Sequence, residues 1–111
     1  MLSATRTLEA RVVLRLHEQA SARQYRDLGV FVRYGVERIE RDVGRAESWM
    51  VTIAPTRDGF SSVVITEDAG IVIQATGRGL DGALAAWDAL CSVEQLLHDD
   101  RARRDSMVGA A

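Results

Sequence analysis

Polar and apolar positions alternate first with the period of a strand and then with the period of a helix. From Leu8 to Leu16 every second residue is apolar, which predicts a strand with one face on a core, although these residue types also suit a helix. Ser21 and Gln24 have the spacing of a capping box, which marks a helix start. Behind them an apolar stripe recurs every three or four residues and predicts a long amphipathic helix that ends at Gly44. The stripe consists of Tyr25, Leu28, Val32, Val36, Ile39 and Val43.

The second half of the chain predicts three strands and a second helix. The strands cover 49–54, 60–66 and 71–75, and the turn signals between them indicate an antiparallel meander. A flexible corner at 77–79 then leads to Asp81, an N-cap for a helix that runs to about His98. Two apolar stripes compete to be the buried face of this helix: Leu80, Leu84, Trp87 and Cys91, or Ala83, Ala86, Leu90, Val93 and Leu97.

These elements predict an α+β fold with the order β-α-β-β-β-α. The economical packing is one four-stranded sheet with both helices on one face, which leaves the other face open to water or to a partner. A single domain is expected over 1–104, followed by a flexible C-terminal tail at 105–111. Trp49 and Trp87 are expected to anchor the core. Glu94, which one of the competing stripes would bury, is expected to be exposed or paired with arginine.

Composition narrows the class of protein. The chain has 111 residues, of which 47% are apolar and 27% charged, and this balance is typical of one globular domain. One Cys and two His allow neither an intrachain disulfide nor a zinc cluster. The sequence shows neither a signal peptide nor a membrane-spanning run, so cytoplasm is the expected location. Since no nucleophile, base and orienting group can be assembled, we expect neither an enzyme nor a cofactor.

Charge is distributed unevenly along the chain. All 14 basic residues are arginine, against 16 acidic residues. Residues 79–100 carry five acids and no base, whereas arginine is concentrated in 21–45 and in the C-terminal segment. The polar face of the first predicted helix is either a solvated surface or a phosphate-binding one. Its bases are Arg23, Arg26, Arg33, Arg38, Arg41 and Arg45.

The element order and several short segments resemble one bacterial-type family. The first helix, Ser21 to Arg45, has the family's Ser/Thr start, spaced apolar positions and basic end. The stronger match follows the last strand, in Ile73-Gln-Ala-Thr-Gly-Arg78, Asp81, Ala85-Ala-Trp-Asp88, Val93-Glu-Gln-Leu-Leu97 and Arg101-Ala-Arg-Arg104. On these residues the chain resembles the short form of the ribosome hibernation-promoting factors and ribosome-associated translation inhibitors.

The resemblance implies a translation inhibitor that binds the small ribosomal subunit and its ribosomal RNA and blocks initiation under stress. Phosphate contacts would come from arginine side chains. The candidates are Arg23, Arg26, Arg33 and Arg41 on the first helix, Arg78 in the corner, and Arg101, Arg103 and Arg104 in the C-terminal segment. No metal or cofactor is implied.

A second hypothesis is a protein-interaction module that kept the fold and lost RNA binding, with a homodimer or another protein on the open sheet face. The acidic second helix favours it, because the family carries bases there. A double-stranded RNA-binding domain comes third, since Asp81-Gly82 stands where such domains carry lysine.

Overall fold

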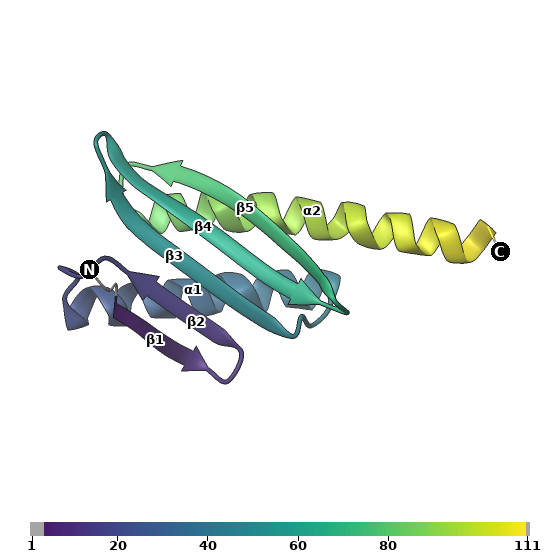
Figure 1. The fold of residues 1–111 in the computed structure, drawn as a ribbon, viewed down its shortest axis with the longest axis horizontal. Helices are drawn as coiled ribbons and strands as arrows, with labels where there is room; N and C mark the ends of the chain where they lie inside the picture. Colours follow the sequence, from purple (N-terminus) through teal and green to yellow (C-terminus); the bar gives the residue numbers. More distant parts are fainter. Residues whose placement is uncertain (1–3, 111) are drawn as a thin grey trace.

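The computed structural model describes residues 4–110, in which the element order is β-β-α-β-β-β-α (Figure 1). One mixed sheet holds all five strands in the order β1-β2-β3-β4-β5. The predicted α+β class is confirmed, whereas the predicted four-stranded sheet is wrong. Residues 1–3 of the predicted domain and residue 111 of the predicted tail lie outside the described part. The bounds are β1 Ala4–Glu9, β2 Val12–Leu16, α1 Ala22–Val43, β3 Ser48–Thr56, β4 Gly59–Asp68, β5 Ile71–Gly79 and α2 Gly82–Ala110.

The additional strand comes from the N-terminal segment, which folds back on itself. Ala10 and Arg11 form the turn of a β1–β2 hairpin, so the strand predicted from Leu8 to Leu16 is in fact two strands. Ala-Arg is not one of the dipeptides that mark a tight turn, and the apolar alternation runs through it unbroken. The turn is held by tertiary contacts instead, because the Arg11 guanidinium donates to Glu40 and to the carbonyl of Ala46.

Helix α1 begins and ends as predicted. The Ser21 hydroxyl accepts from the Gln24 backbone N–H at 3.1 Å, and the Gln24 side chain accepts from the Ser21 N–H at 2.7 Å. Gly44 ends the helix at φ 97°, a left-handed conformation that favours glycine. The apolar stripe faces the core, where Leu28 is half-buried and the other five members are buried. α1 thus connects β2 to its parallel neighbour β3.

Strands β3, β4 and β5 form the predicted antiparallel meander, and each is longer than predicted. Pro55 does not end β3, because it pairs with Phe60 and the ladder continues for one more residue pair. The β4–β5 turn holds Ala69 at φ 52° and Gly70 at φ 79°. Two successive left-handed residues match the right-handed twist of a tight hairpin.

Strand β5 also includes the residues predicted as a flexible corner at 77–79, so that prediction is wrong. A Cβ on Gly77 would lie 2.3 Å from the backbone N of Ala89 and 2.6 Å from the carbonyl O of Ala85. One on Gly79 would lie 2.6 Å from the backbone N of Ala85. The two glycines therefore let the α2 backbone approach β5 more closely than any side chain would allow.

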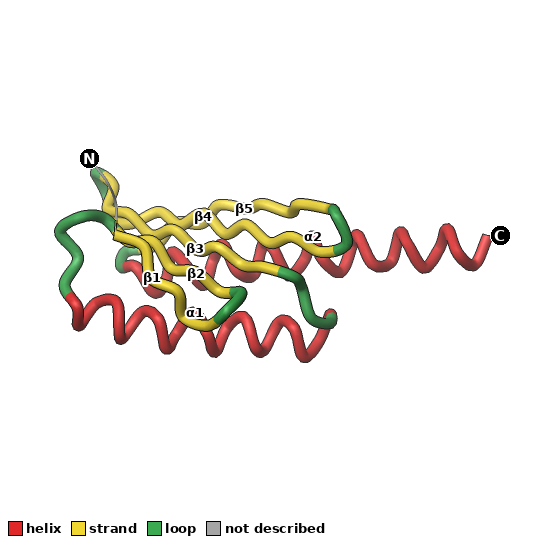
Figure 2. Tube along the Cα trace, turned by 60° about the horizontal axis from the view of Figure 1, so that its bottom comes forward, coloured by secondary structure: helices red, strands yellow, loops and turns green. Residues whose placement is uncertain are grey.

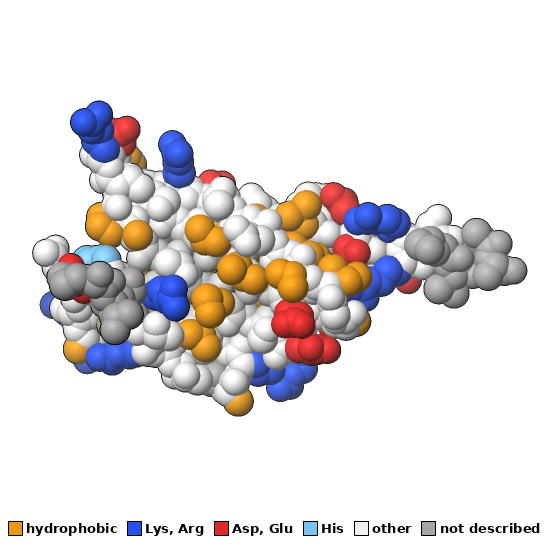
Figure 3. Space-filling view, viewed as in Figure 1, with side chains coloured by type: hydrophobic (Ala, Val, Ile, Leu, Met, Phe, Trp, Pro, Cys, Tyr) orange, Lys and Arg blue, Asp and Glu red, His pale blue; other side chains and the backbone are white. Residues whose placement is uncertain are grey.

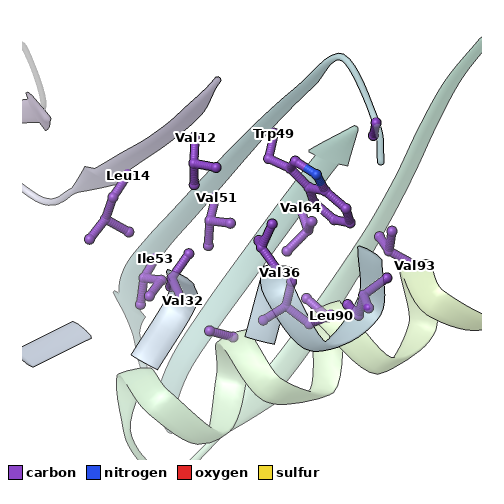
Figure 4. Packing of buried hydrophobic residues seen from close by; sticks show 14 of the residues in the cluster. Val12, Leu14, Val32, Val36, Trp49, Val51, Ile53, Val64, Leu90 and Val93 are labelled. Atoms are coloured by element: carbon purple, nitrogen blue, oxygen red, sulfur yellow. The ribbon is translucent and has the colours of Figure 1, made fainter. Parts of the chain in front are cut away.

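Both helices pack on the same face of the sheet, as predicted (Figure 2). α2 covers mainly β5 and β4, α1 packs against β1 and β2, and the helices contact each other. Between the two layers, Val36 and Leu90 from the helices meet Trp49, Val51 and Val64 from the sheet (Figure 4). The other face of the sheet carries no element of the described chain.

The buried face of α2 is the second of the two competing stripes. Its core residues are Ala86, Leu90, Val93 and Leu97, whereas Leu80 and Leu84 of the other stripe are exposed. Trp49 anchors the core as predicted, but Trp87 remains 37% exposed, so the prediction that it is a core anchor is wrong. Asp81 caps α2 as predicted, since its Oδ1 accepts from the Leu84 N–H at 2.8 Å.

The predicted end of α2 near His98 is wrong, because the helix continues to Ala110 and extends past the sheet (Figure 1). Residues 105–110 of the predicted tail are therefore helical. Ion pairs accompany the first turns of the extension: Arg101 lies 3.1 Å from Asp68 of β4, and Arg104 lies 2.8 Å from Asp100. None of the helices in the described residues has the length and apolarity needed to span a membrane.

Candidate nucleic-acid interface

The outward face of α1 carries four of the predicted contact residues: Arg23, Arg26, Arg33 and Arg41, all of them exposed. They lie off the buried stripe because the helix repeats every 3.6 residues. Within residues 4–110, Arg33 and Arg41 form no ion pair, and Arg23 and Arg26 only approach Asp27, at 3.8 and 4.0 Å. Such long, exposed pairs contribute little, so all four guanidinium groups are available to an anion.

Tyr34 lies on the same outward face and is 58% exposed, next in the chain to Arg33. Sequence reasoning missed it, although an aromatic residue off the apolar stripe was a usable signal. An exposed aromatic ring among arginines is a platform on which an unpaired base stacks. The outward face of α1 therefore combines phosphate-binding groups with one stacking surface.

The seam between α1 and α2 is closed by its own contacts. The Arg38 guanidinium lies 3.2 Å from a Glu94 oxygen and 4.9 Å from the centre of the Trp87 ring. Trp87 also packs against Phe31, with ring centres 5.9 Å apart. Glu94 is thus paired with arginine, as predicted. Because Arg38 contacts both Glu94 and the Trp87 ring, its guanidinium is not available to bind a phosphate.

Further along the seam, three possible metal-ligating groups come together. Asp42, Glu94 and His98 each offer one ligand atom within 4.8 Å of the others. His98 Nε2 already lies 2.9 Å from an Asp42 oxygen, and Glu94 is neutralised by Arg38. All three groups therefore already have a partner, and we assign no metal to them.

The remaining predicted contact residues lie elsewhere. Arg101 pairs with Asp68, and Arg104 and Arg103 approach Asp100 at 2.8 and 3.9 Å. All three lie on the α2 extension. Arg78 lies in β5, and its register opposite Ser61 directs its side chain to the open sheet face, away from both helices. The Arg101 guanidinium also lies against Gly44, directly after the end of α1, so the C-terminal segment adjoins α1. Arg78 is on the other side of the sheet and does not belong to the same basic patch.

Glu40 of α1 connects the helix to the β1–β2 turn and to β3 through its hydrogen bonds. Its carboxylate accepts from the Arg11 guanidinium at 2.6 Å through both oxygens, from the Ala46 N–H at 2.9 Å, and from the Trp49 indole N–H at 3.0 Å. Burial alone would raise the pKa of Glu40. The hydrogen bonds from these three donors and the charge of Arg11 outweigh burial and lower that pKa below its ordinary value of 4.5.

The lowered pKa predicts a pH-dependent contribution to stability. The unfolded chain binds a proton at Glu40 before the folded chain does, so this contribution is present above pH 4.5 and is lost as pH falls through the folded pKa. We expect the difference in unfolding free energy between the wild type and Glu40→Gln to shrink over that window. Urea unfolding of both proteins from neutral pH downward measures it. If the difference in unfolding free energy between the two proteins stays constant below pH 4.5, the pKa of Glu40 is not lowered in the folded protein.

Cys91 is the single cysteine and lies half-buried on α2. Burial raises the pKa of its thiol, the carboxylates of Glu94 and Asp88 raise it further, and Arg38 opposes them only in part. A raised pKa keeps the thiol protonated and unreactive. Cys91 therefore lacks the activation that a nucleophilic cysteine requires.

Comparison with known proteins adds information about the fold. No family model and no curated protein matches the sequence. Among solved structures, the chain is similar to the Thermus thermophilus Protein Y N-terminal domain, with a TM-score of 0.57 and 13% sequence identity. The similarity covers 79% of this chain and 92% of that one. The protein thus shares the fold of the Protein Y N-terminal domain.

Proposed function

We propose that this protein associates with the small ribosomal subunit and that the outward face of α1 binds phosphates of ribosomal RNA. The observation that carries the proposal is the group of exposed arginines on that face, of which Arg33 and Arg41 have no ion-pair partner among the described residues. Guanidinium groups bind phosphate oxygens through two parallel hydrogen bonds. An A-form RNA helix is recognised by its backbone and shape, and such recognition requires no base-specific geometry of α1.

Two further lines support the same partner. The motifs of the last strand and second helix resemble those of the hibernation-promoting factors, and the fold resembles the N-terminal domain of Protein Y. By this resemblance, the protein would occupy the channel where messenger and transfer RNA bind and would inhibit initiation under stress. In this chain Glu94 of α2 is paired with Arg38, but Asp88 and Asp99 of α2 are exposed, so we assign the contact with RNA to α1.

The double charge reversal R33E/R41E is expected to weaken binding to the small subunit. Two phosphate contacts are removed and replaced by repulsion, so we expect binding to fall at least about tenfold and the slope of log affinity against log salt to fall by about 2. Co-sedimentation with purified small subunits over a salt series measures both quantities. The fold is expected to survive, because both side chains are exposed and off the apolar stripe.

The matched control is R15E/R57E, which changes the net charge equally at exposed positions on the sheet side of the molecule. It is expected to retain nearly full binding with an unchanged salt slope. Equal losses in the two double variants would mean that net charge alone determines binding, and this outcome would overturn the assignment of the α1 face.

A further inference from the structure

The open face of the sheet carries an apolar band across its middle. Figure 3 shows apolar side chains gathered over the centre of this face. The band crosses four strands, and its members are Val13 of β2, Met50 of β3, Ile65 and Val63 of β4, and Val72 of β5. Val72 is the most exposed member of the band, at 61%. Met50, Ile65 and Val72 also line a shallow hollow of about 240 Å³. The other four members are half-buried, and together with Val72 they form a continuous apolar surface of the kind that protein partners cover.

Opposite charges flank this band along the strand direction. Glu67 lies at one end, where it pairs in register with Val72 of β5. Arg78 lies six residues beyond Val72 on the same face, at a distance of about 20 Å along the strand. Both side chains are exposed, and neither forms an ion pair with a described residue. Glu67 and Arg78 thus lie at opposite ends of the face, with Ile65 and Val63 of β4 between their levels. Arg15 of β2 lies beside the band, level with Val63, and its Nε donates to the Thr5 hydroxyl at 3.4 Å.

We infer that two copies of this chain stack their open sheet faces about a two-fold axis that lies midway between the two sheets, parallel to them, and runs across the strands. This rotation reverses the strand direction and keeps the order of the strands. The Glu67 end of one copy then meets the Arg78 end of the other, twice, while the two apolar bands cover each other. Sheets stacked face to face lie about 10 Å apart, within reach of both side chains.

The extent of the face sets the strength of the association. The five strands have between 5 and 10 residues each and together cover about 600 Å² per copy, so a dimer buries about 1,200 Å², near the lower limit for a specific interface. The dimer is therefore expected to be reversible and to depend on protein concentration. This inference does not rest on ribosome binding, because α1 lies on the opposite side of the sheet.

Sedimentation velocity over a wide range of protein concentrations tests the inference. The wild type is expected to shift from one chain mass to two as concentration rises. The charge reversals Glu67→Arg and Arg78→Glu are each expected to weaken the dimer about tenfold, because each places two like-charged pairs at the interface. The double variant E67R/R78E restores both pairs with their signs exchanged and is expected to dimerise as the wild type does.

Two further variants complete the test. Met50→Lys places a charge in the apolar band and is expected to give a monomer, whereas Arg57→Glu, on the β3–β4 turn, is expected to change nothing. A double variant no stronger than the single ones would overturn the two-fold pairing. A wild type that stays monomeric at every concentration would overturn the dimer and leave the open face to a different protein.

Discussion

Replacing Gly77 by alanine is expected to lower the free energy of unfolding by about 3 kcal/mol, the upper range for overpacking a core. The added Cβ would meet the backbone of α2 at Ala89 and Ala85, at 2.3 and 2.6 Å, where no rotamer change relieves the contact. α2 would have to move away from β5, the strand against which it packs most extensively. Urea unfolding followed by circular dichroism measures the loss.

Gly82→Ala is the matched control for this change. Its added Cβ would meet only side chains, Ile53 at 3.2 Å and Leu28 at 3.5 Å, and alanine favours the first turn of α2. We expect Gly82→Ala to stay within about 0.5 kcal/mol of the wild type. Equal midpoints for the two variants would contradict the close packing of α2 on β5.

Glu40→Ala is expected to lower the free energy of unfolding by about 3 kcal/mol, because it removes the carboxylate of a largely buried ion pair that also accepts two further hydrogen bonds. The change removes the carboxylate that accepts from the Arg11 guanidinium, which keeps its hydrogen bond to the Ala46 carbonyl. It also leaves the Ala46 N–H and the Trp49 indole N–H without this acceptor. Arg11 forms the β1–β2 turn, so the hairpin is expected to loosen with it. Hydrogen exchange of β1 and β2 amides, together with urea unfolding, measures both effects.

Glu37→Ala serves as the control on the same helix. It makes the same chemical change at an exposed position three residues earlier, where no described residue depends on the carboxylate. We expect a change of less than about 0.5 kcal/mol. If Glu40→Ala were no less stable than Glu37→Ala, the role of Glu40 in joining α1 to the hairpin would be wrong.

The sequence predicted α1 correctly because the residues that define this helix lie close together in the chain. The capping box at Ser21 and Gln24 and the stripe behind them define α1 because a helix buries one face regardless of its partner. The β1–β2 hairpin was missed because Arg11 fixes its turn through a residue of α1. Gly77 and Gly79 suggested a corner, since glycine marks both turns and close approaches, and only the position of α2 distinguishes the two.

In the candidate interface, too, the features set by nearby residues were predicted and those set by distant residues were not. That Arg23, Arg26, Arg33 and Arg41 are exposed follows from helical spacing, and the structure agrees, whereas Arg38 is half-buried. Which arginines are neutralised depends on residues far apart in the chain: Arg38 pairs with Glu94, and Arg101 pairs with Asp68. The sequence placed Arg78 in a corner, and its position on the open face, opposite Glu67 across an apolar band, needed the strand register.

The most direct test of the proposed function is co-sedimentation of the purified protein with small ribosomal subunits at low and at moderate salt. Ribosome association through α1 predicts pelleting with the subunits at low salt and a marked loss at moderate salt, because released counterions drive phosphate binding. Protein that remains at the top of the gradient at both salt concentrations would contradict the proposal.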